Sequence, residues 1–118
     1  MSPIIGIDLG TTNSAVAFMS PDGPKLIPNA LGENLTPSVV GLDEKGNLLV
    51  GATARELRVT KPERCASLFK RYMGTDWSAT LAGREFGPEE LSGLVLRSLK
   101  ADAEAFFKED VKQAVITV

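Results

Sequence analysis

The residues best suited to chemistry lie in a short turn between two apolar runs near the N-terminus: Asp8, Gly10, Thr11, Thr12 and Asn13. Gly10 can adopt positive φ without penalty, so the amides and hydroxyls after it can converge on one anion. An ionised carboxylate at the end of a buried run is costly unless it is paired, so Asp8 needs a partner or a metal ion. These features predict a phosphate-binding turn. A plain β-hairpin with a glycine turn is the alternative, because short glycine motifs have many false matches.

Two apolar runs flank the turn and must position it. Residues 4–7 form a nearly continuous β-branched run, which suits a strand buried on both faces. Residues 14–19 form the return strand, and the turn signal at 21–24 leads into a third strand at 25–28. The sequence therefore predicts an antiparallel meander.

The middle of the chain carries the signals of a smaller lobe. The expected elements are an extended segment at 36–42, a strand at 48–50, a helix at 52–60, a second short helix at 63–73 ending at Gly74, and a loop at 75–87 with at most a short strand at 84–86. Lys61-Pro62 separates the two helices because proline disfavours helical backbone before it. Lys70 and Arg71 fall in the last turn of the second helix, where basic residues complement the helix dipole. Trp77 is expected to cover this lobe.

The C-terminal third predicts one long helix and one strand. Pro88 at the first helical position, with two acids after it, begins a helix that extends to about Lys108. Its apolar side chains recur at three- and four-residue spacing, which marks a core face: Leu91, Leu94, Val95, Leu99, Ala103 and Phe106. A right-handed crossover then places the strand at 113–118 parallel to the first strand. The expected sheet order is third, second, first, final, which leaves 113–118 as an exposed edge.

Composition excludes several classes of function. The 118 residues, 43% hydrophobic, suit one small domain, and a net charge of −2 creates no general attraction for nucleic acid or anionic membrane. Cys65 is the single cysteine, which excludes an internal disulfide, and it is expected to pack as a small apolar side chain. The absence of histidine argues against zinc chemistry. No signal peptide or transmembrane run is recognisable, so a cytoplasmic location is expected.

Five ordered blocks resemble DnaK-type heat-shock chaperones over essentially the whole chain. Residues 6–14 are similar to the first phosphate loop of the actin, sugar-kinase and chaperone ATPase superfamily. The other similar blocks are Asn29–Gly32 with Thr36-Pro37-Ser38, Leu49–Ala54, Phe69–Gly74 and Ala114–Val118. Phe69 before the Lys-Arg pair, and the short interval from Gly74 to Pro88, look most like the HscC branch.

The resemblance implies an α/β fold of the ribonuclease-H-like or actin-like ATPase type, in which a mixed sheet carries an inserted small lobe. Residues 1–35 and 88–118 would form the sheet and helix of the first subdomain, and residues 36–87 the inserted lobe. The chain would be an N-terminal fragment of the nucleotide-binding domain. The second phosphate loop and the substrate-binding domain are expected beyond Val118, so the fragment alone should be inactive.

The resemblance also implies roles for individual residues. Asp8 would be catalytic and would lie beside a magnesium ion, held through water. The turn at 10–13 would hold the β- and γ-phosphates of ATP or ADP, with Gly10, Thr11, Thr12 and Asn13 as the binding residues. Lys70 matches the catalytic lysine, and an ammonium near the γ-phosphate can offset charge that develops during phosphoryl transfer.

The implied function is a stress-response chaperone that couples ATP turnover to binding and release of unfolded polypeptide, aided by a J-domain co-chaperone. Asn34-Leu35 replaces the Arg-Thr usual in the family, and the short 74–88 interval puts a standard exchange-factor partnership in doubt. The alternatives are a sugar or carboxylate kinase of the same superfamily and an actin-like, nucleotide-switched scaffold. The exposed strand at 113–118 predicts self-association of the fragment.

Overall fold

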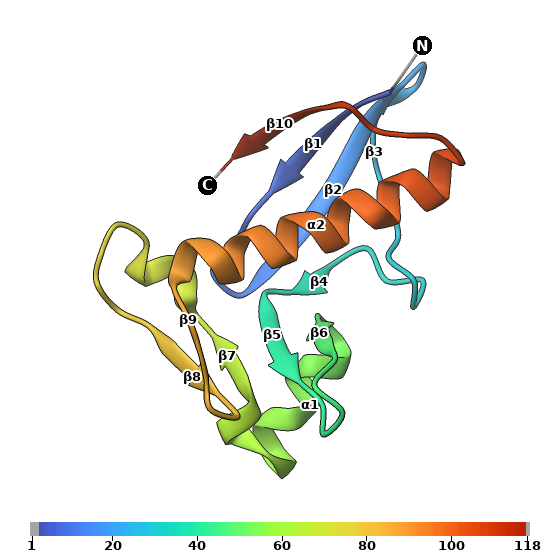
Figure 1. Cartoon of the computed structure of the whole chain (residues 1–118). Helices are drawn as coiled ribbons and strands as arrows, with labels where there is room; N and C mark the ends of the chain where they lie inside the picture. Colours follow the sequence, from blue (N-terminus) through green and yellow to red (C-terminus); the bar gives the residue numbers. More distant parts are fainter. Residues whose placement is uncertain (1–2, 118) are drawn as a thin grey trace.

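The computed structural model describes residues 3–117, and its main sheet contains the N-terminal hairpin. Strands β1 (Ile4–Asp8), β2 (Asn13–Ser20), β3 (Gly23–Leu26) and β10 (Gln113–Thr117) lie in the order β10-β1-β2-β3, and β4 (Thr36–Pro37) also pairs with β2 (Figure 1). β10 is parallel to β1, whereas β2 is antiparallel to both β1 and β3. The predicted sheet order is confirmed. The third strand begins earlier than predicted because Gly23 already pairs with Ser20.

Helix α2 (Pro88–Phe107) crosses one face of this sheet and supplies much of the core (Figure 1). The helix buries Leu91, Val95, Leu99 and Ala103, and the sheet contributes Ile5, Ile7, Leu9 and Val16 to the same cluster. The predicted helix and its apolar stripe are confirmed, except that Phe106 is 47% exposed. Burial of these side chains holds α2 against the sheet, and the sheet carries the turn between β1 and β2.

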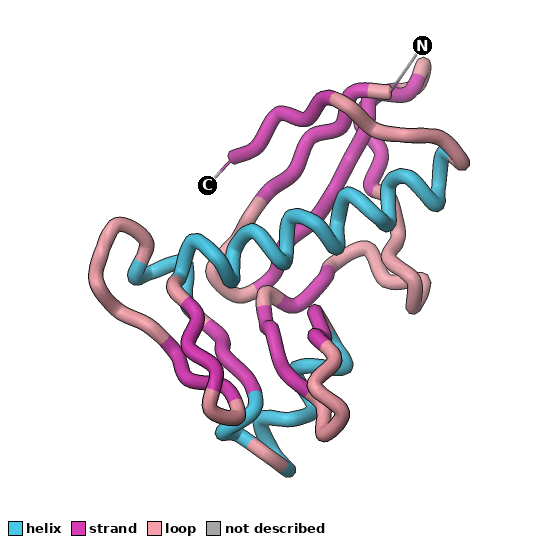
Figure 2. The backbone as a smooth tube through the Cα atoms, viewed as in Figure 1, coloured by secondary structure: helices cyan, strands magenta, loops and turns pink. Residues whose placement is uncertain are grey.

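The sequence predicted that the first strand is buried on both faces, and this prediction is wrong. Ile5 and Ile7 are buried, whereas Ile4 is 58% exposed and Asp8 is also exposed. Side chains alternate along a strand, and within residues 3–117 only the α2 side of the sheet is covered by a helix. Figure 2 shows the helix on that one side.

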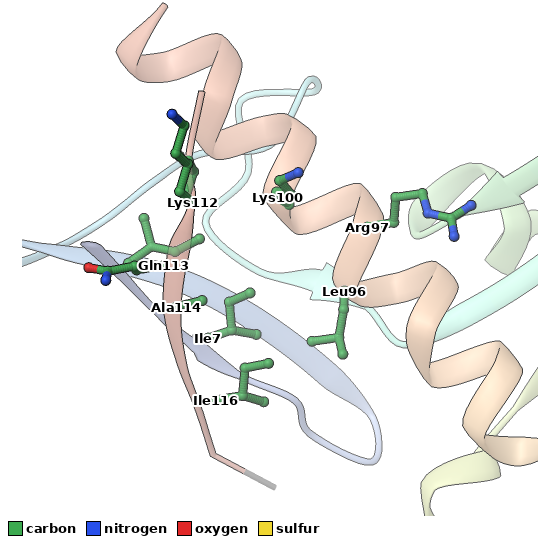
Figure 3. Close-up of a pocket in the computed structure, with 10 residues that line it drawn as sticks. Ile7, Leu96, Arg97, Lys100, Lys112, Gln113, Ala114 and Ile116 are labelled. Carbon is green, nitrogen blue, oxygen red and sulfur yellow. The ribbon is translucent and has the colours of Figure 1, made fainter. Parts of the chain in front are cut away.

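A groove of about 540 Å³ opens between α2 and the β10 edge of the sheet (Figure 3). Its apolar lining includes Ile7, Leu96 and Ile116. Three cationic residues also line it: Arg97, Lys100 and Lys112.

Strand β10 forms the expected edge of the sheet. All five of its residues are exposed, and among residues 3–117 it pairs only with β1. Val118, the last residue of the predicted strand, lies outside the described residues.

The middle of the chain forms a second, three-stranded sheet. Strands β5 (Val39–Leu42), β6 (Leu48–Val50) and β7 (Cys65–Ser67) have the order β6-β5-β7. Helix α1 (Ala52–Thr60) packs so closely on β5 that a Cβ at Gly41 would lie 2.8 Å from Leu57 Cδ1. The predicted hairpin and the predicted 52–60 helix are confirmed.

The predicted helix at 63–73 is wrong. A 3-10 turn at Pro62–Arg64 is followed by β7 and a short 3-10 helix at Phe69–Tyr72. Leu68 has φ 59°, a left-handed conformation that interrupts any helix. Pairing with β5 overrides the helical composition of this segment, because it places Ala66 in the core.

The predicted loop at 75–87 contains a hairpin, β8 (Ala79–Leu81) and β9 (Arg84–Phe86). Trp77 stacks on Tyr72 with ring centroids 4.6 Å apart and packs against the core, so it covers this lobe as predicted. Cys65 is half-buried, and burial raises the pKa of its thiol.

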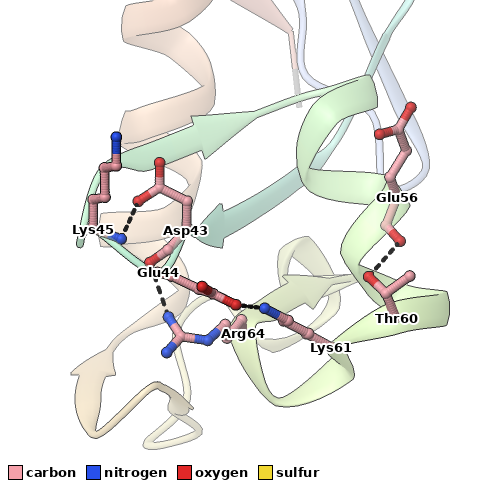
Figure 4. A network of polar contacts seen from close by, with 7 residues as sticks. All are labelled: Asp43, Glu44, Lys45, Glu56, Thr60, Lys61 and Arg64. Carbon is pink, nitrogen blue, oxygen red and sulfur yellow. Dashed lines mark hydrogen bonds and ion pairs between the residues drawn. The ribbon is translucent and has the colours of Figure 1, made fainter.

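Polar contacts tie the β5–β6 turn to the segment after α1 (Figure 4). Arg64 Nη1 donates to the Asp43 carbonyl oxygen at 2.8 Å, and Lys61 forms an ion pair with Glu44. The Asp43 carboxylate accepts hydrogen bonds from Asn47 and Lys45, which lower its pKa. These links hold the small lobe together at its outer end.

Neither helix in residues 3–117 combines the length and the apolar character needed to cross a membrane.

Candidate phosphate-binding site

The turn between β1 and β2 is folded so tightly that only glycine fits at position 10. A Cβ placed on Gly10 would lie 2.1 Å from the Asn13 carbonyl oxygen, which is far inside van der Waals contact. Gly10 does not have positive φ, so the sequence-based reason for a glycine here was wrong. The close approach of Asn13 is the actual reason.

Two buried serines hold this turn in place. The Gly10 N–H donates to Ser14 Oγ at 3.3 Å, and Ser38 Oγ donates to the Gly10 carbonyl oxygen at 2.8 Å. The two hydroxyls lie 2.8 Å apart. Because the Ser38 proton is already used, the Ser14 hydroxyl donates to Ser38. Both side chains are almost fully buried, at 1% and 2% exposure, and the network satisfies both.

The backbone of the turn is also held by β4 and by the backbone of Ser38. β4 pairs with the start of β2, with Asn13 opposite Pro37. The Ser38 N–H then donates to the Thr12 carbonyl oxygen at 2.9 Å. The segment leading into the small lobe therefore sets the conformation of residues 10–13.

Asp8 lies at the end of β1, directly before the turn. Thr117 Oγ1 is 3.3 Å from Asp8 Oδ1, and the Leu9 N–H donates to the Thr117 carbonyl oxygen at 2.9 Å. The prediction of a costly buried carboxylate is wrong, because Asp8 is on the uncovered face of the sheet. Its side chain is open to a ligand from solvent.

Lys70 comes from a different segment. It is half-buried in the 3-10 helix at Phe69–Tyr72, which Phe69 anchors in the core with 1% exposure. Among the described residues, its ammonium forms no ion pair of 4 Å or less. Asp8 directly precedes the turn in the chain, whereas within residues 3–117 Lys70 forms no hydrogen bond with Asp8 or with the turn.

The sequence profile of the Hsp70 protein family matches residues 4–82 and 78–118 of this chain. The chain belongs to the Hsp70 family. Hsp70 proteins are chaperones that bind ATP or ADP with magnesium on an actin-like ATPase fold, and the mixed α/β architecture described above is consistent with that fold. The serine-pinned turn is therefore a candidate phosphate site of an Hsp70 protein.

The sequence did not reveal the two residues that hold the turn of this Hsp70 chain, Ser14 and Ser38. Ser14 had been placed in the 6–14 block and the return strand, and Ser38 in the extended segment at 36–42 and a family block, but neither had been given a role in holding the turn. The available signal was a hydroxyl within each apolar segment, at the start of the return strand for Ser14 and in the extended segment at 36–42 for Ser38, since a buried hydroxyl needs a partner. Their mutual contact spans 24 residues of sequence and was not visible in the local pattern.

The Hsp70 chain offers one carboxylate at the turn for a divalent cation. Within residues 3–117, no group of three or more His, Cys, Asp or Glu side chains is arranged to hold a metal ion. A single carboxylate still fits magnesium, which commonly keeps several waters and binds one or two carboxylates together with substrate phosphates. Asp8, exposed beside the turn, meets that requirement.

Proposed function

We propose that this chain forms one wall of the ATP site of an Hsp70 nucleotide-binding domain. In this proposal the turn formed by Gly10, Thr11, Thr12 and Asn13 holds the β- and γ-phosphates through backbone N–H groups and hydroxyls. The observation that carries it is the rigid turn, in which Ser14 and Ser38 fix the backbone of Gly10. A pre-set turn binds phosphate without a further cost of ordering its backbone.

Lys70 is proposed as the residue that acts on the transferred group. Its ammonium would lie near the γ-phosphate, offset the charge that develops on the phosphoryl oxygens and orient the attacking water. Phosphoryl transfer depends mainly on such positioning and electrostatics. The Phe69 anchor supports this role because it restricts the backbone that carries the lysine.

Asp8 is proposed to hold magnesium, through water. The ion, when bound, neutralises charge on the phosphates. The chain's own contribution is the carboxylate, which β1 and the Thr117 hydroxyl orient at the edge of the turn. Asp8 directly precedes the phosphate-binding turn, and this proximity supports its role in holding magnesium.

The whole protein is proposed to be a cytoplasmic heat-shock ATPase that uses ATP turnover to bind and release unfolded polypeptide, with a J-domain co-chaperone. An HscC-like branch is supported by Phe69 before Lys70-Arg71 and by the short 74–88 interval, which holds the compact β8–β9 hairpin. The two family matches overlap at 78–82, within that interval. Residues 1–35 with 88–118, and residues 36–87, are proposed as the two subdomains.

The magnesium dependence of ATP binding in the full-length protein tests the proposal. Asp8→Asn should remove most of the magnesium-dependent gain in affinity and hydrolysis, because it replaces the carboxylate beside the turn. Asp22→Asn, at an exposed turn on the far end of β2, is the matched control. An unchanged magnesium dependence in Asp8→Asn would exclude the assigned role.

A further inference from the structure

The 3-10 helix that carries Lys70 is held only weakly by its own hydrogen bonds. It has four residues, Phe69–Tyr72. The two backbone N–H···O bonds that close it are both long, at 3.3 Å, with the Leu68 and Lys70 carbonyl oxygens as acceptors. Hydrogen-bond geometry is poorer in a 3-10 helix than in an α-helix, and one turn of helix is not stable by itself. Contacts with other elements must therefore set the position of Lys70.

The start of this segment is anchored in the core. The Phe69 side chain is 1% exposed and belongs to the same hydrophobic cluster as Leu91 and Val95 of α2. Lys70 follows directly, and its own side chain is only half-buried. An anchor before Lys70 leaves the backbone after it free to pivot, so a second contact is needed to fix the direction of the lysine.

Glu89 supplies that contact at the other end of the segment. The Gly74 N–H donates to Glu89 Oε1 at 2.8 Å, although the two residues are 15 positions apart in the sequence. Gly74 has φ 83° and follows the 3-10 helix, and among residues 3–117 no backbone oxygen accepts its N–H. A carboxylate accepts a stronger hydrogen bond than a neutral oxygen does. The Glu89 side chain thus ties the end of the segment to α2.

Helix α2 holds this carboxylate in a fixed place. Glu89 lies in the first turn, between Pro88 and Leu91, which are both buried. The N-terminus of a helix also favours a negative charge. On the same helix, the buried Ser92 hydroxyl lies 3.5 Å from the Met73 sulfur. Two side chains of α2 therefore contact the two residues that follow the 3-10 helix.

We propose that Glu89 is a positioning residue for Lys70. In this role, which rests on the proposed function, it keeps the lysine aimed at the transferred phosphoryl group. Glu89 forms no ion pair of 4 Å or less with Lys70 within residues 3–117, so it acts through the backbone of Gly74 and not on the ammonium charge. A displacement of about 1 Å in a group that acts on the reacting atoms can cost about 10²-fold in rate.

Single-turnover ATP hydrolysis by variants of the full-length protein tests this role. Glu89→Ala should lower the rate by about tenfold and leave the affinity for ATP unchanged, because it loosens Lys70 without touching the nucleotide. Glu89→Gln keeps an oxygen that can accept the Gly74 N–H, so it should retain most of the wild-type rate. Glu90→Ala is the matched control, because Glu90 is also an exposed acid of the first turn and forms no hydrogen bond with Gly74.

A second comparison separates positioning of Lys70 from a general loss of stability. If Glu89 acts through Lys70, Glu89→Ala should cause no further loss of rate in the Lys70→Ala background. A merely structural role would slow both backgrounds by the same factor, and that result would overturn the proposal. An equal loss of rate in Glu90→Ala, or a wild-type rate in Glu89→Ala, would overturn it too.

Hydrogen exchange in the nucleotide-free, full-length protein gives a readout that does not depend on turnover. The Gly74 amide should exchange about tenfold faster in Glu89→Ala, because its acceptor is lost, and at the wild-type rate in Glu90→Ala. Unchanged exchange in Glu89→Ala would show that the carboxylate does not hold the segment. A slow Lys70→Ala variant with a wild-type rate in Glu89→Ala would contradict only the role of Glu89, whereas wild-type turnover in Lys70→Ala would contradict the proposed function as well.

Discussion

The hydroxyls of Ser14 and Ser38 lie 2.8 Å apart in the core, and each is hydrogen-bonded to the backbone of Gly10. Ser14 belongs to the main sheet, whereas Ser38 lies between β4 and β5, where the chain enters the small lobe. A single pair of side chains thus links both parts of the chain to the phosphate-binding turn. The conformation of the turn depends on the position of the small lobe.

Removal of either hydroxyl should destabilise the protein. Ser38→Ala leaves the Gly10 carbonyl oxygen and the Ser14 hydroxyl without their partner, which costs about 1–3 kcal/mol. Ser14→Ala should have a similar effect, and the double mutant should lose less than the sum, because the residues share one network. Urea unfolding measures these changes, with exposed Ser78→Ala as the control. Strictly additive losses would show that the network is not coupled.

Two glycine substitutions should have opposite effects on stability. Gly10→Ala forces a methyl group to within 2.1 Å of the Asn13 carbonyl oxygen and should cost about 1–3 kcal/mol or more. Gly93→Ala meets no atom within 4 Å inside α2 and should gain about 0.5–1 kcal/mol. Thermal unfolding of the two variants compares them directly. A neutral Gly10→Ala variant would refute the close packing described for the turn.

Asp102 should make stability depend on pH. Burial raises the pKa of its carboxyl group, and the Ala30 N–H acts in the opposite direction. Because the folded pKa lies above the unfolded value, the native state favours the proton, and stability falls as pH rises through the folded pKa. Asp102→Asn should therefore stabilise the protein at pH 7, with a gain that shrinks as pH is lowered toward about 4.

Denaturant unfolding at several pH values measures this dependence, with Asp110→Asn in an exposed loop as the control. A gain from Asp102→Asn that is the same at every pH would rule out the carboxyl as its cause.

The exposed β10 edge should mediate self-association of this chain. No strand among residues 3–117 pairs with the outer side of β10, and Val115 and Ile116 are 64% and 46% exposed. Such edges pair with other strands, so a dimer joined along β10 is expected at about 100 μM. Val115→Lys should weaken it, whereas Val59→Lys on the exposed face of α1 should not. Sedimentation that shows a monomer in the wild type would contradict the prediction.

Local signals were sufficient for the elements that carry strong periodicity or clear boundaries. Helix α2 followed from Pro88 and the spacing of its apolar side chains, and the order of the main sheet followed from the crossover rule. These elements place Asp8 and the turn at one end of β1. The general position of the candidate site was therefore predictable.

The remaining features depend on contacts between distant residues. β7 lacks β-branched residues and is a strand because it pairs with β5, so composition alone predicted a helix. The exposure of Asp8 depends on which face of the sheet α2 covers. The roles of Ser14 and Ser38 depend on a contact between their hydroxyls, which forms only when the folded chain brings Ser38 against the turn.

Single-turnover ATP hydrolysis by Lys70→Ala in the full-length protein tests the central claim most directly. The rate should fall by at least about 10²-fold while nucleotide affinity changes far less, because the lysine acts mainly on the transition state. Arg71→Ala, the exposed neighbour in the same 3-10 helix, should retain a rate close to that of the wild type. Wild-type turnover in Lys70→Ala would contradict the proposal that this lysine and the serine-pinned turn form the phosphoryl-transfer site.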